Sequence, residues 1–153
     1  MIVSFTGHAS VCSNDRVKEL IKEQMRNNIG NAEYIGCYLG GYGGFGEICA
    51  RACRELKKEY GGIELIYVTP YRSLSEQAKI KEMLSYGWYD TSIYPPIENV
   101  PYRFAISKRN EWMMANADIV IAYVKRSYGG AYRSLQVAVR KKKKIINICD
   151  LLS

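Results

Sequence analysis

The sequence predicts a three-layer α/β fold, in which a mostly parallel sheet of five or more strands carries helices on both faces. Short apolar segments of strand length alternate along the chain with segments whose apolar residues recur at helical spacing. The short segments are apolar throughout, which is typical of parallel strands buried on both faces. The chain has 153 residues, of which 48% are hydrophobic, so we expect one domain over residues 1–153.

Each element is expected from a local signal. The expected strands are residues 2–6, 34–39, 63–69, 118–124 and 145–149, with a brief further strand near 92–94. The expected helices have their apolar residues in 17–29, 45–60, 74–84, 103–116 and 131–139. Asn14 or Asp15 can cap the first helix, because a short polar side chain accepts from the first free amides. The segment 85–101 is expected to be irregular, since Gly87 and three prolines interrupt it.

The cysteines fit neither a disulfide framework nor a zinc site. Their number is odd, with Cys12 the first of five, and no C-x-x-C pair occurs. Helical spacing puts Cys49 and Cys53 on the packed face of their helix, which favours a core role over reactivity. With a single histidine in the chain, we expect no metal and no cofactor.

The start of the chain bears on its location. Residues 1–6 lack the basic and long apolar segments of a signal peptide, and no apolar run approaches the roughly 20 residues that span a bilayer. We therefore expect a cytoplasmic protein that does not bind membranes, and we expect it to form a homo-oligomer.

Charge is distributed unevenly. Residues 1–99 carry 11 basic and 12 acidic groups, a net of −1, whereas residues 100–153 carry 11 basic and 3 acidic groups, a net of +8. This asymmetry indicates an anionic partner such as a nucleotide phosphate or nucleic acid. Five of the basic groups form the run Arg140–Lys144, which we interpret as a solvated helix end, where cations also complement the helix dipole.

A glycine-rich loop lies between an expected strand and an expected helix. Five of the seven residues from Gly40 to Gly46 are glycine. Glycines let the backbone approach a ligand closely, and the amides at a helix N-terminus attract phosphate. We expect this loop to hold phosphate or ribose. Its candidate ligand-binding residues are Gly41, Gly43, Gly44 and Gly46.

Glu47 follows this loop, in the first turn of the helix. Its carboxylate can serve only as a partner of the helix dipole, bond ribose hydroxyls, or act as a general base.

A second glycine loop also follows a strand and precedes a helix. In Ser127–Ala131, the serine can cap the helix or bond a phosphate. The amides of Gly129, Gly130 and Ala131 are expected to form a second anion site.

Three further groups are candidates. Arg109 shares a helical face with apolar residues, so it needs an anionic partner, which can be a ligand or one of Glu47, Glu111 and Asp118. Its neighbour Asn110 is a candidate ligand contact. Gly7 and His8 end the first expected strand, and the histidine either contacts the ligand or bonds to loop backbone.

A group of aromatic residues lies in the irregular segment. It either stacks on a base or covers the core, and its members are Tyr86, Trp88, Tyr89 and Tyr94.

Several segments together resemble a known superfamily. They are Ser4–His8, Gly41–Glu47, Arg109–Met113, Ala117–Ala122 and Gly129–Ala131. In this order they resemble the SLOG superfamily, the Rossmann-like domains related to bacterial DNA-processing proteins and to the LOG cytokinin-activating enzymes, and in particular its small stand-alone bacterial members. The resemblance implies a Rossmann-like fold with a pocket for nucleotides or nucleotide-derived molecules at the carboxyl ends of the strands.

The resemblance leaves three functions open. We expect first a domain that binds a nucleotide or a nucleotide-derived ligand, in the manner of a sensor. One alternative is a LOG-like hydrolase that cleaves the N-glycosidic bond of nucleoside monophosphates, with Glu47 and Arg109 as catalytic residues. Arg109 matches the family's arginine, but Ser127–Ser134 lacks the threonine and glutamate of the hydrolase signature. The other alternative is a single-stranded nucleic-acid-binding module that uses the basic last third of the chain.

Overall fold

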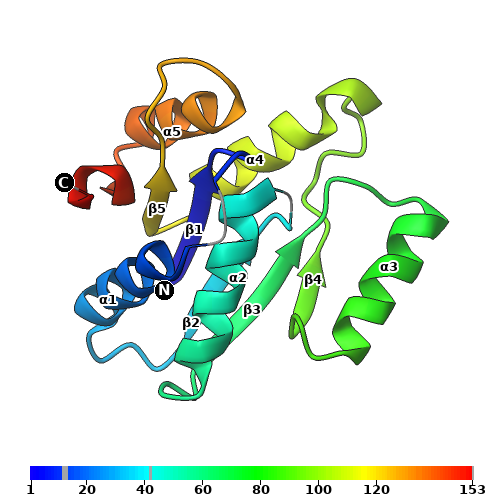
Figure 1. Cartoon of the computed structure of the whole chain (residues 1–153). Coiled ribbons are helices and arrows are strands. Elements are labelled where there is room, and N and C mark those ends of the chain that lie inside the picture. Colours follow the sequence, from blue (N-terminus) through cyan, green and yellow to red (C-terminus); the bar gives the residue numbers. More distant parts are fainter. Residues whose placement is uncertain (12–13, 42, 153) are drawn as a thin grey trace.

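The computed structural model describes residues 1–11, 14–41 and 43–152, so Cys12 and Tyr42 lie outside the described residues. The described residues form a six-stranded parallel sheet in the order β4-β3-β2-β1-β5-β6 (Figure 1). The strands are β1 (Ile2–Gly7), β2 (Ile35–Leu39), β3 (Ile63–Val68), β4 (Thr91–Ile93), β5 (Ile119–Tyr123) and β6 (Lys144–Asn147). The predicted parallel sheet is thereby confirmed, as is the brief strand near 92–94.

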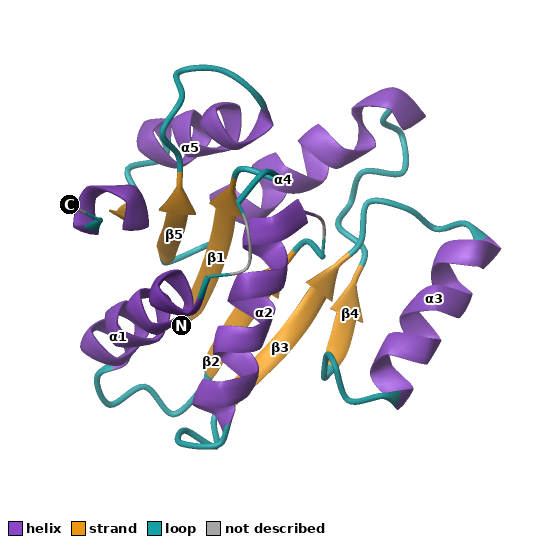
Figure 2. Ribbon diagram, viewed as in Figure 1, coloured by secondary structure: helices purple, strands orange, loops and turns teal. Residues whose placement is uncertain are grey.

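Helices cover both faces of the sheet, which confirms the three-layer arrangement (Figure 2). The helices are α1 (Asp15–Ile29), α2 (Gly43–Lys57), α3 (Leu74–Ser85), α4 (Ala105–Ala115) and α5 (Gly130–Arg140), with 3-10 turns η1 (Tyr102–Phe104) and η2 (Ile148–Leu151). Apolar residues of α1, α2 and α3 share one core cluster on the first face. Apolar residues of α4 and α5 form a second cluster on the opposite face.

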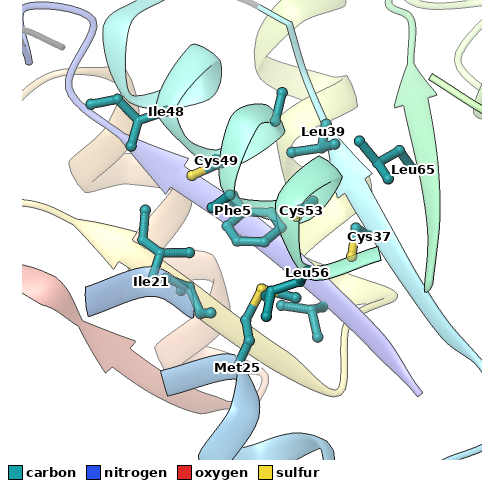
Figure 3. Packing of buried hydrophobic residues seen from close by; sticks show 14 of the residues in the cluster. Phe5, Ile21, Met25, Cys37, Leu39, Ile48, Cys49, Cys53, Leu56 and Leu65 are labelled. Carbon is teal, nitrogen blue, oxygen red and sulfur yellow. The ribbon is translucent and has the colours of Figure 1, made fainter. Parts of the chain in front are cut away.

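The larger core lies between the sheet and the helices α1 and α2 (Figure 3). Phe5 and Leu39 from the strands and Ile21 of α1 belong to this cluster. The thiols of Cys49 and Cys53 are fully buried, and burial raises the pKa of Cys49. A hydrogen bond with Cys37, together with burial, raises the pKa of Cys53. Both cysteines are therefore core residues, as their helical spacing predicts.

Side-chain hydrogen bonds decide where several elements begin and end. The Asn14 side chain accepts from the amides of Arg16 and Val17 at 2.8 and 3.3 Å, so Asn14 is the cap of α1. The last strand ends at Asn147 rather than at residue 149. There the Asn147 side chain accepts from the Cys149 amide at 3.2 Å and starts η2, a local bond that competes with the strand ladder.

The basic run Arg140–Lys144 spans the last residue of α5, the turn after it and the first residue of β6. Lys142 has a φ of 57°, and its amide donates to the carbonyl of Val139, so the helix closes in a left-handed turn. Since β6 begins at Lys144, this turn lies at the amino end of the parallel strands. The loops after β1, β2 and β5 lie at the carboxyl end. The two glycine loops therefore share one end of the sheet, as predicted, with β1 between their strands.

Among the described residues, no helix is both long enough and apolar enough to cross a bilayer.

Candidate functional site

A cleft opens where the carboxyl ends of β1, β2 and β5 meet. At this point the chain order reverses, since β1 has β2 on one side and β5 on the other, and ligands of open parallel sheets bind at such a switch. The cleft has a volume of about 300 Å³. We call it the strand-end cleft. The predicted site residues that line it are Gly7, His8, Gly41, Gly46, Arg109, Asn110, Gly130 and Ala131.

The structure places the other predicted site residues outside this lining. Glu47 is exposed and is the fifth residue of α2, so it lies past the first turn where it was expected, and it is not among the residues that line the cleft. Gly43, Gly44, Ser127 and Gly129 belong to the same loops but lie beside the cleft. The two glycine loops thus come together, whereas the carboxylate proposed as a general base does not join them.

Arg109 is held by the backbone at the ends of two strands. Only 2% of the residue is exposed. Its Nη1 donates to the carbonyls of Gly40 at 3.1 Å and Val68 at 2.7 Å, while Nε donates to the Asn110 Oδ1 at 2.9 Å. Arg109 therefore ties α4 to the loops after β2 and β3, and it stands in the wall of the strand-end cleft.

Two of the carboxylates considered as partners of Arg109 are engaged elsewhere. Glu111 pairs with Lys108 at 3.1 Å, and the Asp118 carboxylate accepts from the Ile2 amide at 2.7 Å. The sequence predicts an anionic partner for Arg109, whereas the structure shows hydrogen bonds to backbone carbonyls. The fold brings these carbonyls within reach from distant parts of the sequence.

His8 joins the loop after β1 to the loop after β5. Its Nε2 accepts from the amides of Lys125 at 2.9 Å and Arg126 at 3.4 Å, so the ring is neutral. Burial and the nearby cations Arg126 and Lys125 lower the pKa of His8. Of the two roles considered for His8, the structure shows the bond to loop backbone, made by a ring that also lines the cleft.

Packing explains most glycines of the first loop. A Cβ on Gly44 would lie 1.7 Å from the Val11 carbonyl oxygen, and one on Gly43 would lie 2.8 Å from the Ala9 Cα. Gly41 has a φ of 73°, and a Cβ there would lie 2.4 Å from the Tyr67 ring. Gly46 differs, because the nearest neighbour of its Cβ would be the Gly41 nitrogen at 4.0 Å. The missing side chain of Gly46 therefore keeps the cleft open and is not required for close packing against another part of the protein.

The N-terminus of α5 opens onto the cleft. Its cap residue is Gly129, with a φ of 95°, and no side chain of the described residues caps the helix. The alternative in which Ser127 caps this helix is therefore wrong. Gly130 and Ala131 line the cleft, and a Cβ on Gly130 would meet nothing within 4 Å. The first amides of a helix attract anions, so this end of α5 suits a phosphate.

The strand-end cleft continues into a groove between α4 and α5. This α4–α5 groove has a volume of about 560 Å³ and shares Ile106, Asn110 and Gly130 with the cleft. Its lining includes three exposed arginines, and Arg126 lines the cleft itself. The groove arginines are Arg103, Arg133 and Arg140. Among the described residues that line the groove, Glu111 is the only acidic one.

The predicted aromatic wall does not assemble. Tyr86 and Trp88 precede β4 and lie at the amino end of the sheet, with ring centroids 5.2 Å apart. Tyr94 follows β4 and lies at the other end. Tyr128 is an exposed aromatic residue next to Arg126, which lines the cleft, and the Arg126 guanidinium lies 5.2 Å from the centroid of its ring. The +8 charge of residues 100–153 indicates a basic surface in this part of the chain. The periodicity of the sequence could not show that Arg126 and the three groove arginines line two connected hollows.

The sheet order and the cleft at its switch point define a Rossmann-like α/β domain. No known protein-family model matches the chain, and no curated protein matches it. Two solved structures with this fold are DNA processing protein A chains. The Helicobacter pylori protein, described for its single-stranded DNA binding mode, has a TM-score of 0.60 at 18% identity, over 95% of this chain and 63% of that chain. The Streptococcus pneumoniae protein has a TM-score of 0.58 at 14% identity, over 94% of this chain and 48% of that chain.

At these identities the comparison shows the fold. This chain spans less than two thirds of the length of either neighbour.

Proposed function

We propose that this chain binds single-stranded nucleic acid across the strand-end cleft and the α4–α5 groove. The observation that carries the proposal is one continuous basic surface at these two hollows, with Arg126 in the first and three arginines in the second. Guanidinium groups suit phosphates, because their forked donors match phosphate oxygens. The groove volume of about 560 Å³ and its open course favour a strand over a single small molecule.

Two further observations support this function. Tyr128 is 65% exposed beside Arg126, an arrangement that offers a base a ring to stack on next to a phosphate contact. The Helicobacter pylori neighbour with this fold is a single-stranded DNA binder.

The test is fluorescence anisotropy with a labelled single-stranded DNA of about 16 nucleotides, the upper end of common site sizes, over a range of salt concentrations. We expect the triple variant Arg103→Gln, Arg133→Gln, Arg140→Gln to bind roughly 100-fold more weakly. Its salt slope should be less steep by about 2, since each phosphate contact on a single strand contributes about 0.7.

The matched control is the triple variant Lys141→Gln, Lys142→Gln, Lys143→Gln. It removes the same charge from the turn after α5, outside the groove. We expect this control to change affinity and salt slope much less. Equal losses in both variants would show nonspecific attraction to a basic surface and would contradict the groove as the binding site.

A nucleotide in the strand-end cleft is a second candidate function. The uncapped N-terminus of α5 and the open space beside Gly46 and Gly130 favour it, and a volume of about 300 Å³ suits a small ligand. Competition by a nucleoside 5′-monophosphate that displaces the DNA from the wild type would support it, and failure to bind at millimolar concentration would count against it. Replacing Lys141–Lys144 by glutamine is expected to leave the affinity for the nucleotide unchanged. The hydrolase alternative is not proposed, because Glu47 does not line the cleft.

A further inference from the structure

A third hollow lies at the same end of the sheet, beyond β3 and β4. It has a volume of about 210 Å³, far more than the roughly 30 Å³ share of one water in the liquid. Its walls come from the loop after β3, the residues after β4, and η1. We call it the tyrosine hollow, after Tyr71, Tyr94 and Tyr102, which line it. In Figure 1 these segments lie at the upper right, above α3 and β4.

The rings of the hollow present an open aromatic face. Tyr71 and Tyr102 stack with ring centroids 4.9 Å apart and an interplanar angle of 18°. Tyr102 is nevertheless 77% exposed, so the stack covers one side of its ring and leaves most of the residue open. The Arg72 guanidinium lies 5.5 Å from the centroid of Tyr94. Exposed planar rings beside a cation are the groups on which nucleobases stack.

Buried hydrogen bonds hold this platform in place. The Glu76 carboxylate is buried and accepts from the Thr69 hydroxyl at 2.6 Å and from the Tyr67 hydroxyl at 3.1 Å. The Thr69 oxygen in turn accepts from the Tyr71 amide at 3.2 Å. On the other side, the Phe104 amide donates to the Pro101 carbonyl at 2.8 Å and closes the turn that carries Tyr102. Because these bonds already order the loops that carry the tyrosines, binding of a base costs less conformational entropy.

The hollow and the basic groove share one ridge of the chain. Tyr102 and Ala105 line the tyrosine hollow, while Arg103 and Ile106 line the α4–α5 groove. A strand that crosses this ridge meets arginines on one side and tyrosines on the other. Arg72 and Glu98 both line the hollow and balance each other in charge, so the hollow suits a neutral base better than a phosphate.

We propose that the tyrosine hollow is a base-binding subsite that takes one nucleobase of the single strand whose phosphates contact the groove arginines. This inference rests on the proposed function and extends it, because it assigns a stacking site at residues that the charge pattern does not mark.

The experiment compares two labelled strands of about 16 nucleotides. One is ordinary single-stranded DNA, and the other has abasic sites throughout. We expect Tyr102→Ala to weaken binding of the ordinary strand by about 5- to 150-fold, with an unchanged salt slope. The same variant should bind the abasic strand as the wild type does. Tyr102→Phe should retain binding, because it keeps the ring.

The matched control is Tyr86→Ala, which removes another exposed tyrosine, 61% exposed against 77% for Tyr102, from the opposite end of the sheet. If Tyr102→Ala and Tyr86→Ala have the same effect on the ordinary strand while the arginine triple variant still loses affinity, the subsite is refuted and the proposed function stands. An equal loss for the abasic strand also refutes the subsite. If the wild type binds neither strand, both proposals fail.

Discussion

Gly44 and Gly46 lie two residues apart in the first turn of α2 but serve different purposes. A side chain on Gly44 would collide with the backbone of the loop after β1, since its Cβ would lie 1.7 Å from the Val11 oxygen. A side chain on Gly46 would enter the strand-end cleft, which Gly46 lines, with its nearest neighbour at 4.0 Å. The glycine-rich loop thus combines close packing of backbone with the opening of a cavity.

Alanine at each position separates these purposes. We expect Gly44→Ala to lower the free energy of unfolding by about 3 kcal/mol, the upper end of the cost of overpacking. Gly46→Ala should raise it by up to about 1 kcal/mol, because alanine favours the helix, and should weaken binding in the cleft. Urea unfolding and nucleotide binding measure the two effects. A Gly46→Ala protein as unstable as Gly44→Ala would show that Gly46 also serves packing.

Arg109 acts at the scale of elements, because it connects α4 with the ends of β2 and β3. Its Nη1 donates to the carbonyl of Gly40, just after β2, and to that of Val68, the last residue of β3. The resemblance to the hydrolase arginine pointed to catalysis. The contacts point to a positioning role, in which Arg109 shapes the loop that forms one wall of the cleft.

This role predicts how Arg109→Ala behaves. We expect the free energy of unfolding to fall by about 2–5 kcal/mol, since the change removes the hydrogen bonds to the Gly40 and Val68 carbonyls and creates a cavity. Affinity for a nucleoside 5′-monophosphate and for its nucleoside should fall equally. Calorimetry with both ligands makes the comparison, with Arg109→Lys in reserve if the alanine variant does not fold. A selective loss for the phosphate-bearing ligand with normal stability would place the guanidinium on the phosphate instead.

At the scale of the whole molecule, one end of the sheet gathers the features that suit an anion. The cleft, Arg103, Arg133 and the N-terminus of α5 lie at or near the carboxyl end, although they come from distant parts of the sequence, whereas the groove extends along α5 to Arg140 at the last residue of that helix. The lysine run lies at the other end, so the +8 charge of residues 100–153 is divided between two surfaces. The net charge of this segment therefore overstates the positive charge that lies near the cleft.

Stability should respond to pH through His8, the single histidine of the chain. Its pKa in the folded protein is lowered from the ordinary 6.5 by burial and by Arg126 and Lys125. As pH falls below about 6.5, the unfolded chain takes up this proton before the folded protein does, so the free energy of unfolding decreases. The decrease continues until the pH passes below the lowered pKa, with a slope of at most about 1.4 kcal/mol per pH unit.

Urea unfolding across the range of about pH 5 to 8 tests this linkage. In His8→Gln, whose amide oxygen can accept the same backbone bonds without titrating, the slope should vanish. Glu55 adds its own loss of stability mainly below about pH 5, because the unfolded chain takes up that proton near the ordinary pKa of 4.5, whereas hydrogen bonds with Lys18 and Lys22 lower the pKa to about 2 in the folded protein. A slope that persists in His8→Gln would assign the pH dependence to another group.

Local signals determined the layers and most element boundaries. Apolar runs such as Ile119–Tyr123 and helical stripes such as that of α1 depend on burial along one element, which periodicity records directly. The placement of both glycine loops at one end of the sheet follows as well, because carboxyl ends of parallel strands meet there. By contrast, Asn147 ends β6 through a side-chain bond that apolar patterning does not reveal.

Only the tertiary structure decided what the candidate residues contact. Arg109 donates to carbonyls at the ends of two separate strands, and Glu47 lies outside the cleft. Tyr71 stacks on Tyr102, which is 31 positions away in the sequence. Such contacts depend on the order of strands in the sheet and on which loops become neighbours. The sequence by itself determined the fold class and the end of the sheet where the candidate site lies, since burial and helix geometry act locally. The lining of the site was settled by long-range packing, which has no local signature.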